Sequence, residues 1–282
     1  MLLLTVPGAV AGSAGVAGAA WASSGASSGA SSGIDDFGCR PSAAHPRPLV
    51  LVHATFTDPL VNWLVAGPYF ASRGYCVFEV DYGQTGLPLV HGIGPIEDSA
   101  RQLAAYVDRV LAATGARQVD LLGHSQGGGV LPRYYLKYLG GAAKVHRLVG
   151  LAPSNHGGTV LGVFTLIQEV PPAAAVLGAA CPACAEQFVG APLENSLDAG
   201  GDTVPGVEYT MIASGLDEVI TPHWNSFLSG PHVHNVVLQD LCPLDLSEHV
   251  LTGALDPIAL HEAANALDPE HATPTDCGSV LS

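Results

Sequence analysis

One stretch decides the predicted fold: residues 119–127, VDLLGHSQG. Its first four residues are typical of a buried strand, and the residues that follow are compatible with a helix. A strand that turns directly into a helix leaves no room for side chains on either side of the central residue. The pattern Gly-x-Ser-x-Gly, formed here by Gly123, Ser125 and Gly127, is typical of a nucleophile elbow in this context. We therefore predict that Ser125 is a nucleophile at the carboxyl end of a parallel sheet, and not part of a plain glycine-rich turn.

Short apolar runs alternate with helical patterns on both sides of this stretch. Six runs are predicted strands: Leu49–His53, Tyr75–Val80, Gln118–Leu122, His146–Leu151, Val207–Ser214 and Asn235–Gln239. Helices are predicted over Ile96–Leu111, from about Gln126 to Leu139, and over Asp256–Leu267, with Asp256 as N-cap and Pro257 in the first helical position. This order predicts an α/β fold with a mostly parallel central sheet and helices on both faces.

Residues 155–205 interrupt the alternation of strands and helices. The segment is long, apolar and rich in Ala, Pro and Gly. Two interpretations remain open: a surface insertion packed on the core, or a partial, lid-like cover over an apolar pocket. In either case the folded part is predicted to be one domain, residues 38–282, with this insertion inside it.

A catalytic serine needs an adjacent base, and an acid must hold that base. In this fold the acid follows the serine along the chain. Asp217 lies in the loop after the predicted strand Val207–Ser214 and is the predicted acid. Glu218 is the alternative, whereas Asp240 and Asp245 come after the next strand, which is too late.

The base must follow the last strand, and His249 occupies that place. The other histidines fit less well, because His261 lies inside the last predicted helix and His271 in the tail. His232 and His234 are predicted to precede the last strand, at its wrong end. His249 is therefore the predicted base of a Ser-Asp-His triad.

The oxyanion of an acyl-transfer reaction needs two preorganised N–H donors. The first expected donor is the backbone of Gln126, the residue after the nucleophile. The second is expected from the loop after the strand Leu49–His53, with Thr55 as the candidate and Phe56 as the alternative. The Thr55 hydroxyl could add a third donor.

Six segments carry a resemblance to a known family: Leu49–Thr55, Asn62-Trp63, Gly123–Gly128, Pro132–Tyr135, Ala152–Gly157 and Asp217. They resemble the secreted bacterial class 2 triacylglycerol lipases, the actinobacterial members most, and the resemblance runs over roughly residues 38–280. It implies an α/β-hydrolase fold, ester hydrolysis by a Ser-Asp-His triad and no cofactor. It also implies that Ser125, Asp217 and His249 form the triad, with Thr55 and Gln126 as oxyanion donors.

One residue departs from the family pattern. The family usually has His-Gly before the oxyanion residue, and this chain has His53-Ala54. An alanine is compatible with the loop if its φ is negative, and otherwise shifts the oxyanion donors. Pro132 is unusual inside a helix, since proline lacks an N–H, but the family shows Pro-Arg at this place too.

Composition and charge exclude other classes of protein. With 48% hydrophobic and 12% charged residues, the chain of 282 residues is typical of a folded protein and not of a disordered one. Its formal net charge is −15, and no Lys or Arg follows Arg147. Nucleic acid is not an expected partner, because phosphate contacts need Lys and Arg. Neutral esters and a transient contact with a lipid interface remain compatible with this charge.

The start of the chain predicts export. Residues 1–22 carry no charge and end in Ala20-Trp21-Ala22, a small-x-small cleavage pattern, so we predict a secretory signal whose basic n-region is missing. A transmembrane anchor is the alternative, but the segment is rich in Gly and Ala. Residues 23–37 are expected to form a Ser/Gly/Ala-rich linker.

Six cysteines fit an exported protein with three disulfides. The sequence does not fix their pairing, and we expect Cys39–Cys76, Cys181–Cys184 and Cys242–Cys277. The spacing of Cys181 and Cys184 could also suit a redox or zinc motif, but no second cysteine pair or nearby histidine supports it. Three further histidines, His223, His232 and His234, fit no recognised metal-site spacing, so no metal is expected.

These observations together predict a secreted serine carboxylic-ester hydrolase of the lipase or esterase type that acts on acylglycerols or similar neutral esters. A polyester depolymerase or an acyltransferase could use the same triad. A non-catalytic binding protein on a hydrolase scaffold is the remaining alternative, and Ala54 is the one residue that favours it. The sequence does not indicate the acyl chain length, interfacial activation or the oligomeric state.

Overall fold

A parallel sheet of six strands forms the centre of the molecule in the computed structural model, which describes residues 33–84 and 88–281. The predicted signal segment and most of the predicted linker lie outside the described residues. The strand order is β2-β1-β3-β4-β5-β6, and every pair of neighbouring strands is parallel. The strands are β1 (Leu49–Val52), β2 (Val77–Val80), β3 (Val119–His124), β4 (Val145–Leu151), β5 (Glu208–Ala213) and β6 (Val233–Val237).

All six predicted strands are present, with ends that differ from the predicted ones by at most two residues, and the last strand is shifted by two residues at both ends. β6 begins two residues earlier than predicted, so His234 lies inside this strand and not before it. Leu238, predicted as strand, begins the short helix α9 (Leu238–Leu241). The apolar run 236–238 does not distinguish the end of a strand from the start of a helix, because both can be buried.

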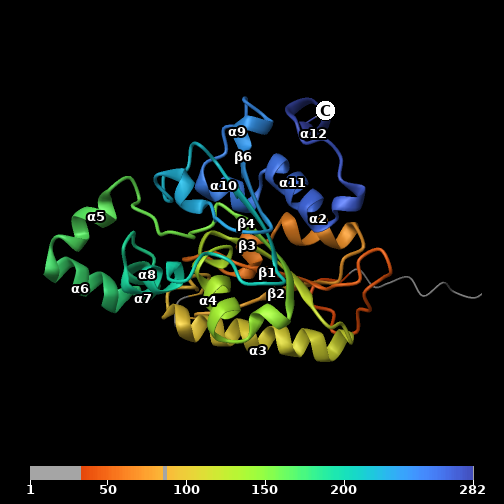
Figure 1. Ribbon diagram of the computed structural model, residues 1–282, viewed down its shortest axis with the longest axis horizontal. Coiled ribbons are helices and arrows are strands. Elements are labelled where there is room, and N and C mark those ends of the chain that lie inside the picture. The colour runs from red at the N-terminus through yellow and green to blue at the C-terminus, as the bar shows by residue number, and fades with distance from the viewer. Residues whose placement is uncertain (1–32, 85–87, 282) are drawn as a thin grey trace, which may run out of the picture.

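Helices cover both faces of the sheet (Figure 1). α3 (Ile96–Thr114) and α4 (Val130–Tyr138) pack on one face, where their apolar side chains share a core with β1, β2 and β3. α2 (Ala66–Ser72) and α11 (Pro257–Leu267) pack on the other face. Shorter helices outside the insertion include α1 (Pro59–Asn62), α10 (His249–Ala254) and α12 (Cys277–Leu281). No helix of the described residues is long and apolar enough to span a membrane.

The helix after the elbow is shorter than predicted. Residues 125–127 form a single 3-10 turn, and α4 begins only at Val130, after Gly128 and Gly129. Pro132 is therefore the third residue of α4. The N–H groups of the first helical turn have no intrahelical acceptor, so the missing N–H of Pro132 costs no hydrogen bond here.

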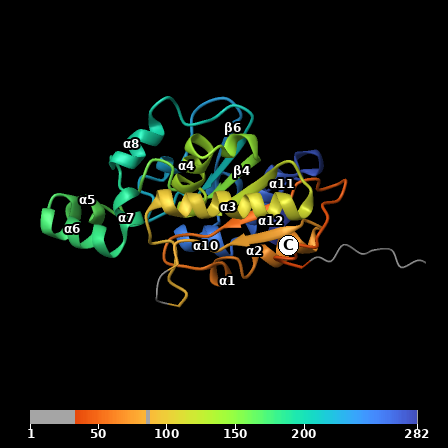
Figure 2. The ribbon, with the colours of Figure 1, turned by 90° about the horizontal axis from the view of Figure 1, so that it is seen from below.

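The insertion predicted over residues 155–205 folds into four helices: α5 (Val163–Gln168), α6 (Pro171–Ala180), α7 (Pro182–Glu186) and α8 (Pro192–Asp198). Three of them begin with a proline at the first helical position, which is the place where proline is tolerated. The four helices project to one side of the sheet, and Figure 2 shows the same offset after the quarter turn. α6 buries none of its residues.

The folded part starts earlier than the predicted boundary at residue 38. The ring of Phe37 packs 5.1 Å from that of Phe78 on β2. The Asp35 carboxylate accepts hydrogen bonds from the Glu79 backbone N–H (2.9 Å) and from the Tyr106 hydroxyl (2.5 Å). Residues 35–37 are thus part of the domain, and the prediction of a linker up to residue 37 was wrong for them.

Three disulfides are present, and their pairing coincides with the expected one: Cys39–Cys76, Cys181–Cys184 and Cys242–Cys277. The first ties the N-terminal segment to the residue before β2. The third ties the C-terminal helix α12 to the end of α9. The second closes a loop of only three residues within the insertion.

We expect the two long-range disulfides to dominate the redox dependence of stability. A bridge across 35 or 37 residues restricts the unfolded chain far more than a bridge across three. Replacing the pair Cys242 and Cys277 with serines should cost about 2–4 kcal/mol of unfolding free energy, and the same change at Cys181 and Cys184 clearly less. Thermal denaturation of both variants tests this, and equal Tm losses would contradict it.

Glu79 on β2 predicts a pH-dependent contribution to stability. Burial, together with the neighbouring Asp35 carboxylate, raises the pKa of Glu79 to about 7 from an ordinary value of 4.5. The folded chain therefore holds this proton more tightly than the unfolded chain. The resulting stabilisation is complete below about pH 4.5 and is lost as the pH rises to about 7.

Replacing Glu79 with glutamine should therefore raise Tm, relative to the unmodified chain, at about pH 8 and change it little at about pH 4. The glutamine amide has the shape of the protonated acid, and it stays neutral at both pH values. Thermal denaturation at both pH values measures the two differences. A Tm difference that is the same at both pH values would refute the assignment.

Candidate active site

Ser125 sits on a sharp turn between β3 and α4, as the elbow pattern predicts. Its φ is +54°, an unusual conformation for a residue other than glycine. A Cβ at Gly123 would lie 1.8 Å from the carbonyl oxygen of Gly127, and one at Gly127 would lie 2.1 Å from that of Val52. Only glycine fits at both positions, so the sequence pattern has a direct steric cause.

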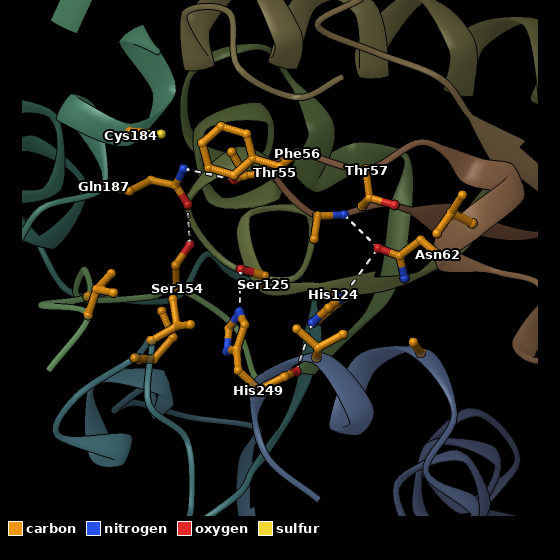
Figure 3. Close-up of a pocket in the computed structure, with 18 of the residues that line it drawn as sticks. Thr55, Phe56, Thr57, Asn62, His124, Ser125, Ser154, Cys184, Gln187 and His249 are labelled. Carbon is orange, nitrogen blue, oxygen red and sulfur yellow. Dashed lines mark hydrogen bonds between the residues drawn. The ribbon is translucent and has the colours of Figure 1, made fainter. Parts of the chain in front are cut away.

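Ser125 and His249 face each other across the carboxyl end of the sheet (Figure 3). The Ser125 Oγ lies 3.0 Å from the His249 Nε2, and both side chains are buried. His249 is the first residue of α10, not part of a loop as expected. The Glu248 carboxylate caps this helix by accepting from the N–H groups of Val250 and Leu251, which fixes the start of α10 and with it the ring.

Asp217 contacts the other nitrogen of the His249 ring, so that Ser125, His249 and Asp217 form a continuous series of contacts. Its Oδ2 lies 2.8 Å from the His249 Nδ1, and its side chain is fully buried. The other carboxylate oxygen accepts from the backbone N–H groups of Val219 (2.8 Å) and Ile220 (2.7 Å). These amides hold Oδ1, so Oδ2 is available to accept a hydrogen bond from the Nδ1–H of His249. With the proton on Nδ1, the lone pair of Nε2 faces Ser125.

The predicted alternatives lie elsewhere. The Glu218 carboxylate accepts from the backbone N–H of His249 (3.3 Å) and does not approach the ring. Asp245 accepts from the Ser247 N–H. His261 contacts the hydroxyls of Thr273 and Thr275 at the outer side of α11.

The loop after β1 carries the expected oxyanion donor Thr55, which lines the same cavity as Ser125. The backbone of this loop is left-handed at Phe56 (φ +63°), and Ala54 is not among the described residues with positive φ. Alanine in place of the usual glycine therefore needs no strained backbone at this position. The Ala54 N–H donates to the Asn62 Oδ1 (2.9 Å), which fixes the loop just before Thr55.

His124, next to the nucleophile, links this loop to the base. Its Nδ1 lies 3.1 Å from the Asn62 Oδ1, and its Nε2 lies 3.1 Å from the His249 carbonyl oxygen. Burial lowers the pKa of His124 to about 3, so its ring is neutral at ordinary pH. A neutral ring has one N–H, so only one of the two oxygens receives a hydrogen bond at a time.

A cavity of about 610 Å³ opens in front of Ser125. Its walls are mostly apolar and include Val61, Leu89, Val160, Phe164 and Ile220. The insertion contributes part of the wall, since Gly158, Val160, Phe164, Cys184 and Gln187 all line it. Of the two interpretations of residues 155–205, the structure favours a partial cover over the pocket.

One group of the described residues could bring three metal-ligand atoms together: His156, Asp198 and Asp202. The guanidinium of the buried Arg133 lies among these carboxylates, 2.8 Å from Asp198 and 3.5 Å from Asp202. Arg133 thus already supplies the positive charge at this cluster. The histidines considered in the sequence, His223, His232 and His234, are not part of this group.

Sequence reasoning missed two residues of the site. Asn62 was noted only as part of the family resemblance, and its role in holding the Ala54 N–H depends on a turn of α1 that no motif marks. Gln187, in the insertion, contacts the predicted oxyanion residues Thr55 and Gln126. No local pattern distinguishes Gln187 from other glutamines, because its partners lie 61 and 132 residues away.

Comparison with known proteins establishes the fold. The sequence profile of the family described as alpha/beta hydrolase fold matches residues 47–176. Aspergillus fumigatus lipase B superposes with a TM-score of 0.65 at 21% identity, covering 82% of this chain and 54% of that one. Bacillus licheniformis lipase BlEst2 in mature form superposes with a TM-score of 0.55 at 18% identity, covering 76% of this chain and 89% of that one. The predicted α/β-hydrolase fold is confirmed.

Sequence relatives match over a shorter stretch. A triacylglycerol lipase of Pseudarthrobacter phenanthrenivorans is 38% identical over 98 residues, which cover 30% of this chain and 27% of the relative. A triacylglycerol lipase of Burkholderia plantarii matches with the same identity over the same length, covering 24% of that relative. The chain thus aligns with about a quarter of the length of these curated relatives. The resemblance to lipases is confirmed over this part of the chain.

Proposed function

We propose that this α/β-hydrolase-fold chain is a serine carboxylic-ester hydrolase of the lipase or esterase type. One observation carries the proposal: the contact series Ser125–His249–Asp217, with distances of 3.0 and 2.8 Å, at the floor of an apolar cavity. A hydroxyl, an imidazole and a buried carboxylate in this order are the parts that acyl transfer needs. The similarity to triacylglycerol lipases over 98 residues supports the same chemistry.

In the proposed mechanism the Ser125 Oγ attacks the ester carbonyl while the His249 Nε2 takes its proton. Asp217 keeps the ring oriented and stabilises the imidazolium through Nδ1. The imidazolium then gives the proton to the leaving alcohol, and the C–O bond to the alcohol breaks. Water, activated by the same imidazole, releases the acid from the acyl-enzyme.

The negative oxygen of the tetrahedral intermediate would be bound by the backbone N–H groups of Gln126 and Thr55. Gln126 lies in the first turn after the elbow, where backbone N–H groups have no intrahelical acceptor. Thr55 borders the cavity opposite His249 (Figure 3). Preorganised donors at such an oxygen typically supply about 3–4 kcal/mol each in the transition state.

The cavity supports a neutral ester with a substantial acyl or alcohol group as substrate. Four apolar residues that line it are at least half exposed: Phe56, Val61, Leu89 and Val250. These side chains are suited to a transient contact with a lipid interface. The net charge of −15 disfavours anionic substrates and anionic surfaces.

Export is part of the proposal. The three disulfides and the apolar segment 1–22 support a secreted protein, because disulfides persist in oxidising compartments. Cofactors and metals have no place in the proposed chemistry.

Hydrolysis of p-nitrophenyl esters from acetate to palmitate by the purified chain tests the proposal. We expect turnover, and labelling of Ser125 by a fluorophosphonate probe, located by peptide mass spectrometry. The chain-length profile then distinguishes an esterase from a lipase, and a parallel assay on polyester films tests depolymerase activity. A folded protein that neither hydrolyses any of these esters nor reacts with the probe would contradict the proposal.

A further inference from the structure

A buried network of side-chain amides and hydroxyls lies behind the proposed oxyanion hole, and the triad does not use it. It joins Gln126 and Thr55 to Gln187, which follows α7 in the insertion. We propose that Gln187 is a positioning residue of the oxyanion hole that directs the Thr55 hydroxyl toward the reacting oxygen. This inference rests on the proposed function, since it assigns a role within that same site.

The Tyr82 hydroxyl and the Gly92 carbonyl fix the orientation of the Gln126 side-chain amide. Its Nε2 donates to the Tyr82 hydroxyl oxygen (3.0 Å) and to the Gly92 carbonyl (3.1 Å). The Tyr82 hydroxyl in turn donates to the His53 carbonyl (2.5 Å), so it can only accept from Gln126. Both protons of the Gln126 amide are therefore used, and its Oε1 must face the insertion.

The orientation of Gln187 is fixed in the same way. Its Nε2 donates to the Gln126 Oε1 (2.6 Å) and to the Ala183 carbonyl (3.0 Å), and its Oε1 accepts from the Ser154 hydroxyl (2.8 Å). Turning the amide over would place an oxygen against the oxygens of Gln126 and Ala183. Gln187 is about nine-tenths buried, so water offers little compensation for such a contact.

The Thr55 hydroxyl faces the Gln187 amide (Figure 3). It donates to the Gln126 Oε1 (3.1 Å), and its oxygen lies 3.3 Å from the Gln187 Nε2. The Gln187 amide makes a shorter bond (2.6 Å) to the same Gln126 oxygen. The Gln126 Oε1 therefore keeps a donor when the Thr55 hydroxyl turns its proton toward the oxyanion.

Without Gln187, the Thr55 hydroxyl would be the remaining donor to the Gln126 Oε1. The hydroxyl could then serve the oxyanion only by leaving that buried oxygen unpaired. The insertion therefore contributes to catalysis through one side chain, besides forming part of the cavity wall.

Three variants test this role: Gln187→Leu, Gln187→Glu and Gln187→Leu in a Thr55→Val background. Removing an oxyanion donor typically lowers kcat by about 100- to 1000-fold, and removing the group that directs one should lower it by about 10- to 100-fold with KM within about threefold. Gln187→Glu keeps the shape but places an oxygen against the Gln126 Oε1, so it should be no more active than Gln187→Leu. In the Thr55→Val background, Gln187→Leu should lower kcat by less than about threefold.

The rates are measured on p-nitrophenyl esters and divided by the sites titrated with a fluorophosphonate, so misfolded protein does not count. Gln168→Leu, an exposed glutamine of the same insertion, is the matched control and should keep full kcat. If the unmodified chain is active and Gln187→Leu keeps its kcat, the inference about Gln187 is wrong and the proposed function stands. An equal loss of kcat with and without the Thr55 hydroxyl also overturns the inference, since the effect would then not act through Thr55. An inactive parent chain overturns the proposed function and the inference together.

Discussion

Replacing Ser125 with alanine is expected to lower kcat for ester hydrolysis by about four to six orders of magnitude. The Oγ is the nucleophile of the proposed mechanism, and no other hydroxyl is within hydrogen-bond distance of the His249 Nε2 among the contacts of the described residues. The substitution removes one atom and leaves the buried His249–Asp217 pair in place. Tm should therefore not fall, which separates lost chemistry from lost structure.

The residues of the triad should act as a unit. His249→Ala should lower kcat about as much as Ser125→Ala, and the double variant should be no worse than either single one. Losses that multiply would indicate that the two side chains serve different steps. A Ser125→Ala protein that keeps most of its activity would remove the basis of the proposed function.

The elbow could be predicted because its cause is local. Gly123 and Gly127 are required by backbone atoms a few residues away in the turn and by the adjoining strand β1. The long amphipathic helix α3 was likewise predictable, because its buried residues recur at helical spacing along one face. The proposed triad residues could be chosen from chain order once the elbow was placed.

The insertion illustrates the opposite case. α5 and α6 bury none of their residues, and α7 and α8 bury two each, so no apolar periodicity marks these short helices. The role of Gln187 depends on contacts with Thr55 and Gln126 that chain folding alone brings together. The predicted bounds of β6 were wrong because only Val236 of this edge strand is buried, and the apolar residues continue past its end into α9.

Replacing Arg133 with methionine is expected to lower the free energy of unfolding by about 3–5 kcal/mol. The guanidinium is 1% exposed and joins α4 to the end of the insertion. It donates to the carbonyls of Asn155 and Leu197 and to the Asp198 carboxylate, and lies 3.8 Å from the Glu194 carboxylate. Without Arg133, Glu194 remains in the interior with no cation beside it.

Glu194 makes the mechanism of this loss testable. Burial raises the pKa of Glu194 well above its ordinary value, and Arg133 is the neighbour that lowers it. If the uncompensated carboxylate causes the loss, then Arg133→Met combined with Glu194→Leu should be more stable than Arg133→Met alone, because apolar side chains can replace a buried ion pair. Arg101→Met, which removes an exposed arginine paired with Glu97 on α3, should change stability by less than about 0.5 kcal/mol. Chemical denaturation of the four proteins measures these differences. A double variant as unstable as Arg133→Met would show that the bonds to the carbonyls of Asn155 and Leu197, and not the charge of Glu194, hold the insertion to α4.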